Sequence, residues 1–161
     1  MKNIKLLSIS SFEIIETNDK TPVFFDSGDS VSVHIKVEMF PSLRGLLELN
    51  QFNKENGKTK NIKISSSLIY SYYDTSQKQR FYFTIKEFTS NSLDELLNDN
   101  KMFLISNNFS FDSKRLPDFK KDNTDNSVSC FFYVLNMNIE NKIFDQILNI
   151  EVPIINRGQR T

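Results

Sequence analysis

The chain has 161 residues, with 20 basic and 20 acidic side chains, and therefore carries no formal net charge at neutral pH. This length suits one domain, so we expect a single unit over residues 1–161, with a flexible tail at 156–161. Balanced charge argues against a nucleic-acid partner, a single cysteine excludes an internal disulfide framework, and the absence of a long apolar run argues against membrane insertion.

The composition favours sheet over helix. There are 15 Phe and 5 Tyr, but no Trp and no Ala. Ala is the best helix former, whereas aromatic and β-branched side chains fit the surface of a pleated sheet.

The N-terminal segment places Lys2 and Lys5 ahead of apolar residues, as a signal peptide would. Its apolar stretch is interrupted by serines and has no small-residue cleavage site, so we predict no signal peptide and a cytoplasmic location. The segment Ile4–Ile15 instead predicts an extended strand, with a bulge where Leu6 and Leu7 break the alternation.

The clearest strand signal follows a short apolar piece, Val23–Phe25, and a turn at Asp26–Asp29. Apolar residues then occupy every second position, at Val31, Val33, Ile35, Val37 and Met39. The residues between them are polar, which predicts a strand with one buried and one solvated face, ended by Pro41.

The middle of the chain predicts two hairpins. Leu46–Phe52 is an expected strand, and Asn56-Gly57 favours a tight turn because both residues tolerate positive φ. Ile62–Tyr73 and Arg80–Phe88 are expected to pair through a turn at Asp74–Lys78. In the second strand we expect one set of side chains to face inward, Phe81, Phe83 and Ile85, and the other outward, Arg80, Tyr82, Thr84 and Lys86.

One short helix is expected at Ser92–Leu97, where Ser92 and Glu95 form a capping box ahead of an apolar stripe. Two strand-like pieces follow, Met102–Ile105 and Asn108–Phe111. The polar segment Ser113–Asn126 predicts an exposed, poorly packed loop.

The C-terminal part predicts two more strands. In Val128–Met137 we place Val128, Cys130, Phe132 and Val134 in one phase, with Cys130 as a core thiol. A turn or a single helical turn is expected at Asn136–Asn141, and Ile147–Ile155 is the final strand, at an edge or ended by Pro153.

Together these elements define a mainly β fold. Eight or nine strands at this spacing predict an immunoglobulin-like or jelly-roll-type antiparallel β-sandwich with one short helix.

Residues that could carry catalysis are sparse, so we expect no enzyme. His34 is the sole histidine and lies on the polar phase of its strand, with no nucleophile motif nearby. The four glycines lie far apart, which excludes a phosphate-binding loop, and the aspartates near Gly28 and in 118–125 lack EF-hand spacing. We therefore expect no metal and no cofactor.

Tyrosines near basic side chains give the candidate ligand site. Tyr73, Tyr82, Arg80 and Lys86 belong to the hairpin, and exposed rings beside polar donors can stack on sugars or bases or anchor a protein partner. The alternative is cross-strand aromatic pairing that stabilises the sheet.

The segment from Thr21 to Glu38 reads TPVFFDSGDSVSVHIKVE, a short apolar piece, Ser-Gly and a long alternating strand. With the strand before it, this order resembles the carbohydrate-recognising C-terminal domain of Wzt-type polysaccharide exporters. The resemblance implies a β-sandwich and carries over no binding residues.

We therefore expect a non-catalytic binding module with a glycan as first-choice ligand. The alternative is a protein–protein interaction or assembly domain, for example a structural or host-interaction protein of a phage or mobile element.

Overall fold

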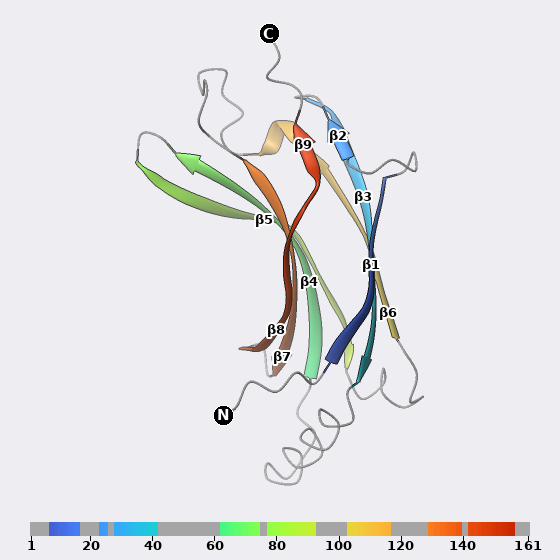
Figure 1. The fold of residues 1–161 in the computed structure, drawn as a ribbon. Coiled ribbons are helices and arrows are strands. Elements are labelled where there is room, and N and C mark those ends of the chain that lie inside the picture. Colours follow the sequence, from blue (N-terminus) through green and yellow to red (C-terminus); the bar gives the residue numbers. More distant parts are fainter. Residues whose placement is uncertain are drawn as a thin grey trace.

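The computed structural model describes residues 7–16, 23–25, 28–41, 62–74, 77–92, 103–116, 129–139 and 142–156. These residues form a β-sandwich, in which a three-stranded and a four-stranded sheet face each other across the core (Figure 1). The described part of the chain contains nine strands, and all pairings but one are antiparallel. The predicted mainly β fold is therefore confirmed.

The three-stranded sheet has the order β1-β3-β6, with β1 at Leu7–Glu16, β3 at Ser30–Pro41 and β6 at Phe103–Asp112. The predicted alternation of β3 is confirmed, because its five alternating apolar residues, from Val31 to Met39, are at most 5% exposed. The bulge in β1 lies between Ile9 and Ser11, a few residues beyond its predicted place. The two pieces expected around Asn107 form one continuous strand.

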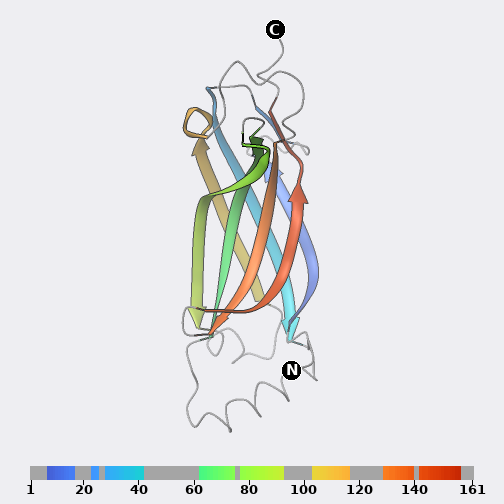
Figure 2. The same cartoon turned by 90° about the vertical axis from the view of Figure 1, so that its left-hand side faces the viewer.

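The four-stranded sheet has the order β5-β4-β7-β8 and lies in front in Figure 2. In chain order, its strands are β4 Ile62–Asp74, β5 Gln79–Ser92, β7 Cys130–Ile139 and β8 Lys142–Val152. The far end of the β4–β5 hairpin leaves the body of the sandwich and projects to the left in Figure 1.

Two short strands complete the fold at one end. β2, Val23–Phe25, pairs in parallel with β9, Ile154–Asn156, which follows β8 after Pro153. Since β8 ends just before that proline and lies at a sheet edge, both parts of the expectation for Pro153 are met. Asn156 belongs to β9, so the expected tail is shorter by at least that residue.

A tight contact joins the Gly28 turn to the end of β6. Ser113 starts a 3-10 turn, η1 at Ser113–Arg115, and its hydroxyl accepts a hydrogen bond from the Gly28 amide at 2.8 Å. The amide of Ser113 donates to the carbonyl of Asp29 at 3.0 Å. Ser113 and Leu116 are buried, so the prediction of a poorly packed loop is wrong for these two residues, because η1 gives them backbone partners and a place on the core.

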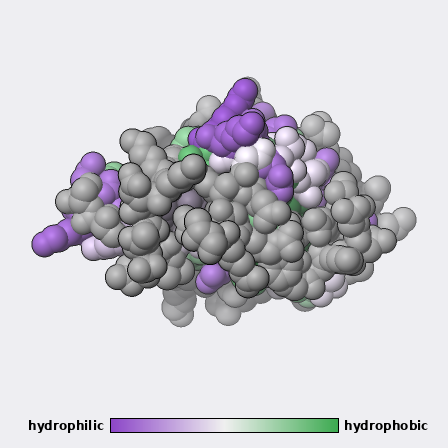
Figure 3. All heavy atoms as spheres, turned by 90° about the horizontal axis from the view of Figure 1, so that it is seen from above, coloured by the Kyte–Doolittle hydropathy of each residue, from purple (hydrophilic) through white to green (hydrophobic). Residues whose placement is uncertain are grey.

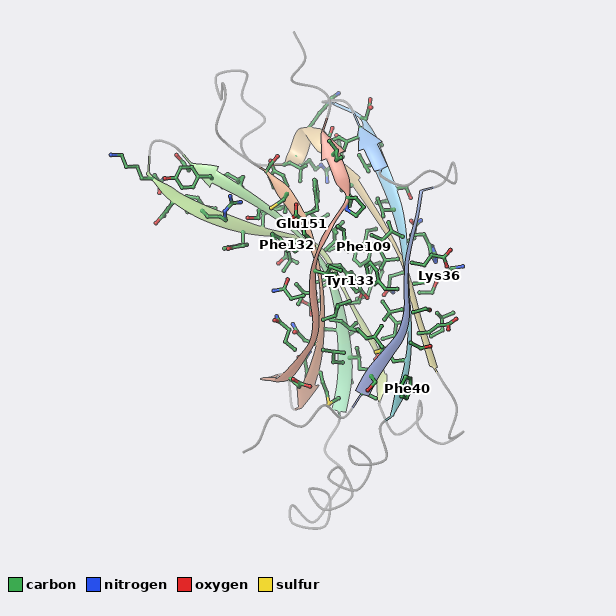
Figure 4. The ribbon with its side chains drawn as sticks, in the orientation of Figure 1. Lys36, Phe40, Phe109, Phe132, Tyr133 and Glu151 are labelled. Carbon is green, nitrogen blue, oxygen red and sulfur yellow. The ribbon has the colours of Figure 1, made fainter. Side chains whose placement is uncertain are left out.

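Aromatic rings connect the two sheets through the core. Tyr133 of β7 lies 5.6 Å from the ring of Phe12 in β1 and 6.2 Å from that of Phe109 in β6. Figure 4 shows Phe109 and Tyr133 between the sheets, with Lys36 on the outer side of β3. The Ser66 hydroxyl donates to the Tyr133 hydroxyl at 2.9 Å, which satisfies this buried phenol.

The phase predicted for β7 is wrong. Its core-facing residues are the other set, namely Phe131, Tyr133, Leu135 and Met137. Both phases of this strand are apolar, so alternation cannot choose between them, and pairing with β4 decides. The strand also continues to Ile139, through residues expected to turn.

Three expectations lie outside the described residues: the strand Leu46–Phe52, the turn at Asn56-Gly57 and, apart from Ser92, the helix Ser92–Leu97. Ser92 is the last residue of β5. The rest of the expected loop, 117–126, also lies outside.

Candidate functional site

The candidate site lies on the β4–β5 hairpin, whose turn is closed by local chemistry. The Asp74 carboxylate accepts a hydrogen bond from the Gln77 amide at 3.1 Å, and Lys78 adopts a left-handed φ of 53°. An aspartate that bonds its own turn and a residue with positive φ together reverse the chain in few residues. Figure 3, seen from above, shows hydrophilic side chains at the left-hand end, where Figure 1 places this turn.

Strand register brings three of the four predicted residues onto one face of this hairpin. Tyr73 pairs with Arg80, and Ser71 pairs with Tyr82. Directly opposed residues lie on the same face, as do alternate residues of one strand. Tyr73, Arg80 and Tyr82 are therefore neighbours, on the side that faces away from the core.

The arginine of this face is held in place. Its Nη1 donates to the Ser71 hydroxyl at 2.9 Å and lies 3.9 Å from the Cys130 sulfur. Ser71 is fully buried, whereas Tyr82 is 68% exposed. The result is an exposed aromatic ring beside a positioned guanidinium, which we call the Tyr82 face: Tyr73, Arg80 and Tyr82.

Lys86, the fourth predicted residue, lies elsewhere. A register shift between Leu68 and Ile69 places it opposite Leu68, which is fully buried and faces the core. Its ammonium lies over the Phe88 ring, 4.7 Å from the centroid. The expectation that Lys86 points outward with Arg80 and Tyr82 is therefore wrong, because one extra residue reverses the alternation beyond a bulge.

The other tyrosines of the hairpin are structural. Tyr72 stacks between Tyr70 at 5.7 Å and Phe81 at 5.6 Å, and Tyr70 contacts Phe131 at 5.1 Å. This row continues the core along the inner side of the projecting hairpin. The alternative interpretation, aromatic pairing that stabilises the sheet, thus holds for the inner face, and the ligand site on the outer face stays a prediction.

Cys130 lies beside the Tyr82 face and is half-buried. Burial raises the pKa of its thiol, and the nearby carboxylate of Glu151 adds to the rise, while Arg80 opposes it. The thiol is therefore protonated at neutral pH and is a weak nucleophile. Its expected place in the core is wrong, since it points away from the core like Phe132.

His34 has a partner that the sequence did not reveal. Its Nε2 lies 2.5 Å from the Ser106 hydroxyl, on the outer side of the three-stranded sheet. Ser32, two residues earlier, donates to Asn108 at 2.8 Å in the same way. These contacts span 72 and 76 residues of sequence, so no local pattern could have identified them.

The outer side of the four-stranded sheet is polar in its central rows. Ser65, Ser67 and Ser71 of β4 are almost completely buried there, between the taller side chains of β5 and β7. Asn138 donates to the Ser65 hydroxyl at 3.1 Å.

The described residues include no cluster of three potential metal-ligating side chains. Nor do they include a helix long and apolar enough to cross a membrane.

Comparisons with known proteins find distant likenesses in structure alone. No family model and no curated protein matches the chain. Spo0M, a sporulation control protein from Bacillus subtilis, matches with a TM-score of 0.40 and 14% identity, over 94% of this chain and 50% of Spo0M. A glycosyl hydrolase family 2 member from Bacteroides cellulosilyticus matches with a TM-score of 0.37 and 18% identity, over 87% of this chain and 14% of the hydrolase.

This chain therefore spans half the length of Spo0M and a small part of the hydrolase. At this level of similarity neither structure indicates what the chain does. The resemblance to Wzt-type domains stays a prediction.

Proposed function

We propose that this chain is a non-catalytic binding module that holds a glycan on the Tyr82 face. The observation that carries the proposal is the 68% exposure of Tyr82 beside an arginine that is already hydrogen-bonded to the sheet. A solvent-exposed aromatic ring gains free energy when its face covers an apolar surface of similar width on a ligand.

A glycan fits this face better than an anion does. Sugar rings present C–H groups on one side and hydroxyls at the rim, which suits a tyrosine ring next to a guanidinium donor. The chain has no net charge, and the Tyr82 face contains one cation, so nothing here concentrates phosphate. The face also stands on a projecting hairpin, where a bulky polymer can approach it (Figure 1).

The experiment is a glycan-array screen of the wild type, followed by calorimetric titration of the best ligand. Tyr82→Ala should weaken binding by about 1–3 kcal/mol, by analogy with stacking of nucleic-acid bases, which is roughly five- to 150-fold in affinity. Tyr73→Ala should weaken it less, because this ring is half-buried against its neighbours. Tyr82→Phe keeps the ring and should retain most of the binding.

Lys86→Ala is the matched control. It removes a cation from the same strand, four residues from Tyr82, but on the core-facing side, so glycan affinity should stay unchanged. Equal losses in Lys86→Ala and Tyr82→Ala would show that the Tyr82 face is not the site.

A wild type that binds no glycan on the array contradicts the proposal. The exposed Tyr82 and Arg80 would then favour the alternative, a protein interaction or assembly domain, because Tyr and Arg are enriched among residues that anchor protein interfaces.

A further inference from the structure

The sandwich has four sheet edges among its described strands: β1 and β6 end the three-stranded sheet, and β5 and β8 end the four-stranded one. An edge strand presents unpaired backbone N–H and C=O groups that can pair with another chain. Proteins usually protect such edges with charges, bulges or proline. An edge strand without such protection is therefore a candidate for pairing with another chain.

Three of the edges are protected. β1 has a register shift and an exposed Glu13. β5 shifts its register against β4 twice and exposes Lys86 and Glu87. β8 shifts twice against β7, exposes Glu151 and ends at Pro153.

β6 has none of these devices. Its ten residues pair with β3 without a register shift, and no charged residue occurs from Phe103 to Phe111. Among the described residues, its backbone pairs with β3 and with no strand on the other side. A long, regular and uncharged edge of this kind is what a partner strand needs.

We propose that β6 pairs with β6 of a second copy of this chain, antiparallel about a two-fold axis, so that two three-stranded sheets form one sheet. The strand is nearly symmetric about Asn107 in residue type. Reversing FLISNNFSF exchanges apolar with apolar and polar with polar residues at every position except Leu104 and Ser110. With the axis at Asn107, Ile105 faces Phe109 and Ser106 faces Asn108 of the other copy.

An uncharged, self-symmetric strand suits its own copy, because a two-fold axis places each residue opposite a matching type and no like charges meet. Asn107 supplies a second reason. Its Oδ1 is buried and has no hydrogen-bond partner among the described residues. On the axis the two Asn107 side chains become direct neighbours, and reorientation of one amide lets it donate to the oxygen of the other.

The test measures the mass of the full chain in solution over a concentration series, by sedimentation. The wild type should form dimers. The double variant Ser106→Lys/Asn108→Lys places lysines opposite lysines across the axis and should raise the dimer dissociation constant by about tenfold or more. Both positions are exposed, and the changes remove only surface contacts with His34 and Ser32, so the monomer should stay folded, which its circular dichroism will show.

Ser10→Lys/Ser11→Lys is the matched control, which also introduces two lysines at exposed positions, on the opposite edge of the same sheet, in β1. It should leave the dimer intact. A dimer that the β1 variant disrupts, and the β6 variant does not, would overturn the proposal.

Charge exchange makes the test independent of any folding defect. Ser106→Glu/Asn108→Glu should also be monomeric alone, and mixing it with the lysine variant should restore a dimer, since opposite charges then face each other. Failure of the mixture to associate would overturn the two-fold arrangement. A wild type that is monomeric at every concentration would overturn self-pairing and leave the β6 edge to an extended segment of another protein.

Discussion

The two faces of the four-stranded sheet use the same aromatic residue types for opposite purposes. On the core-facing side, Phe131, Tyr133 and Tyr70 are almost fully buried and contact one another or the facing sheet. On the outer side, Tyr82 is 68% exposed. Phe132, on the same side, is half-buried (Figure 4). Residue type alone therefore does not decide the role of a ring in this protein.

The two sets of rings differ in what surrounds them on their side of the sheet. The core-facing rings have neighbours on both sheets, whereas no described strand covers the outer side, where β4 carries small serines. We therefore expect a ring on the outer side to contribute little to stability. Substitutions at adjacent positions can separate these two roles.

Phe131 and Phe132 offer the largest contrast, because they are neighbours in β7 on opposite faces. Phe131 is 1% exposed and contacts the rings of Phe25, Tyr70 and Phe111. Phe131→Ala should lower the free energy of unfolding by about 3–5 kcal/mol, since it removes a buried ring and leaves a cavity. Phe132→Ala should cost roughly 1 kcal/mol or less in the same urea titration.

Comparable losses in the two variants would break the comparison. They would mean that the outer side of the sheet is covered as tightly as the core.

Much of the sandwich follows from the sequence. The alternation of β3 gives its buried face, and the turn at Asp74 gives the β4–β5 hairpin, because side-chain period and turn chemistry are local. Tyr73, Arg80 and Tyr82 lie on one face of that hairpin, as expected, for the same reason, and their role in ligand binding stays a prediction. Each of these features depends on residues within one strand or one hairpin.

What the sequence missed depends on pairing between strands. Lys86 changes face because of a bulge set by the β4 register, and the buried phase of β7 is chosen by its neighbour strand. The contact of His34 with Ser106 joins residues 72 positions apart. Such registers follow from packing of the whole sheet, which local patterns do not contain.

Burial of Tyr133 should also make the stability of the protein depend on pH. Burial raises the pKa of its phenol from 10.0 to about 12, although the hydrogen bond from Ser66 opposes the rise. As pH rises from 10 to 12, the unfolded chain loses this proton and the folded chain keeps it. Stability should therefore be intact below pH 10 and fall by on the order of 2–3 kcal/mol by pH 12.

Tyr133→Phe should reduce this loss and also cost about 1–2 kcal/mol at neutral pH, because the Ser66 hydroxyl loses its buried partner. Unfolding titrations at pH 7, 10 and 11.5 test both effects. Tyr82→Phe, which removes a hydroxyl from an exposed ring, is the control at pH 7 and should change stability by no more than about 0.5 kcal/mol. A wild-type slope that survives in Tyr133→Phe would assign the effect to another group.

The smallest effects distinguish the two faces of the hairpin itself. Tyr72 stacks on Tyr70 and Phe81, and each aromatic pair contributes about 0.5–1.5 kcal/mol beyond its buried area. Tyr72→Ala should therefore destabilise the chain by roughly 1–3 kcal/mol. Tyr82→Ala, on the opposite face of the hairpin, should change stability by no more than about 0.5 kcal/mol, as exposed positions usually do.

Thermal melts of the two variants at one protein concentration make the comparison. A clear loss of stability in Tyr82→Ala would show that this ring supports the sheet, and any loss of ligand binding in that variant would then reflect a changed fold. A stable Tyr82→Ala beside a weakened Tyr72→Ala would leave Tyr82 as a ring that the fold does not need.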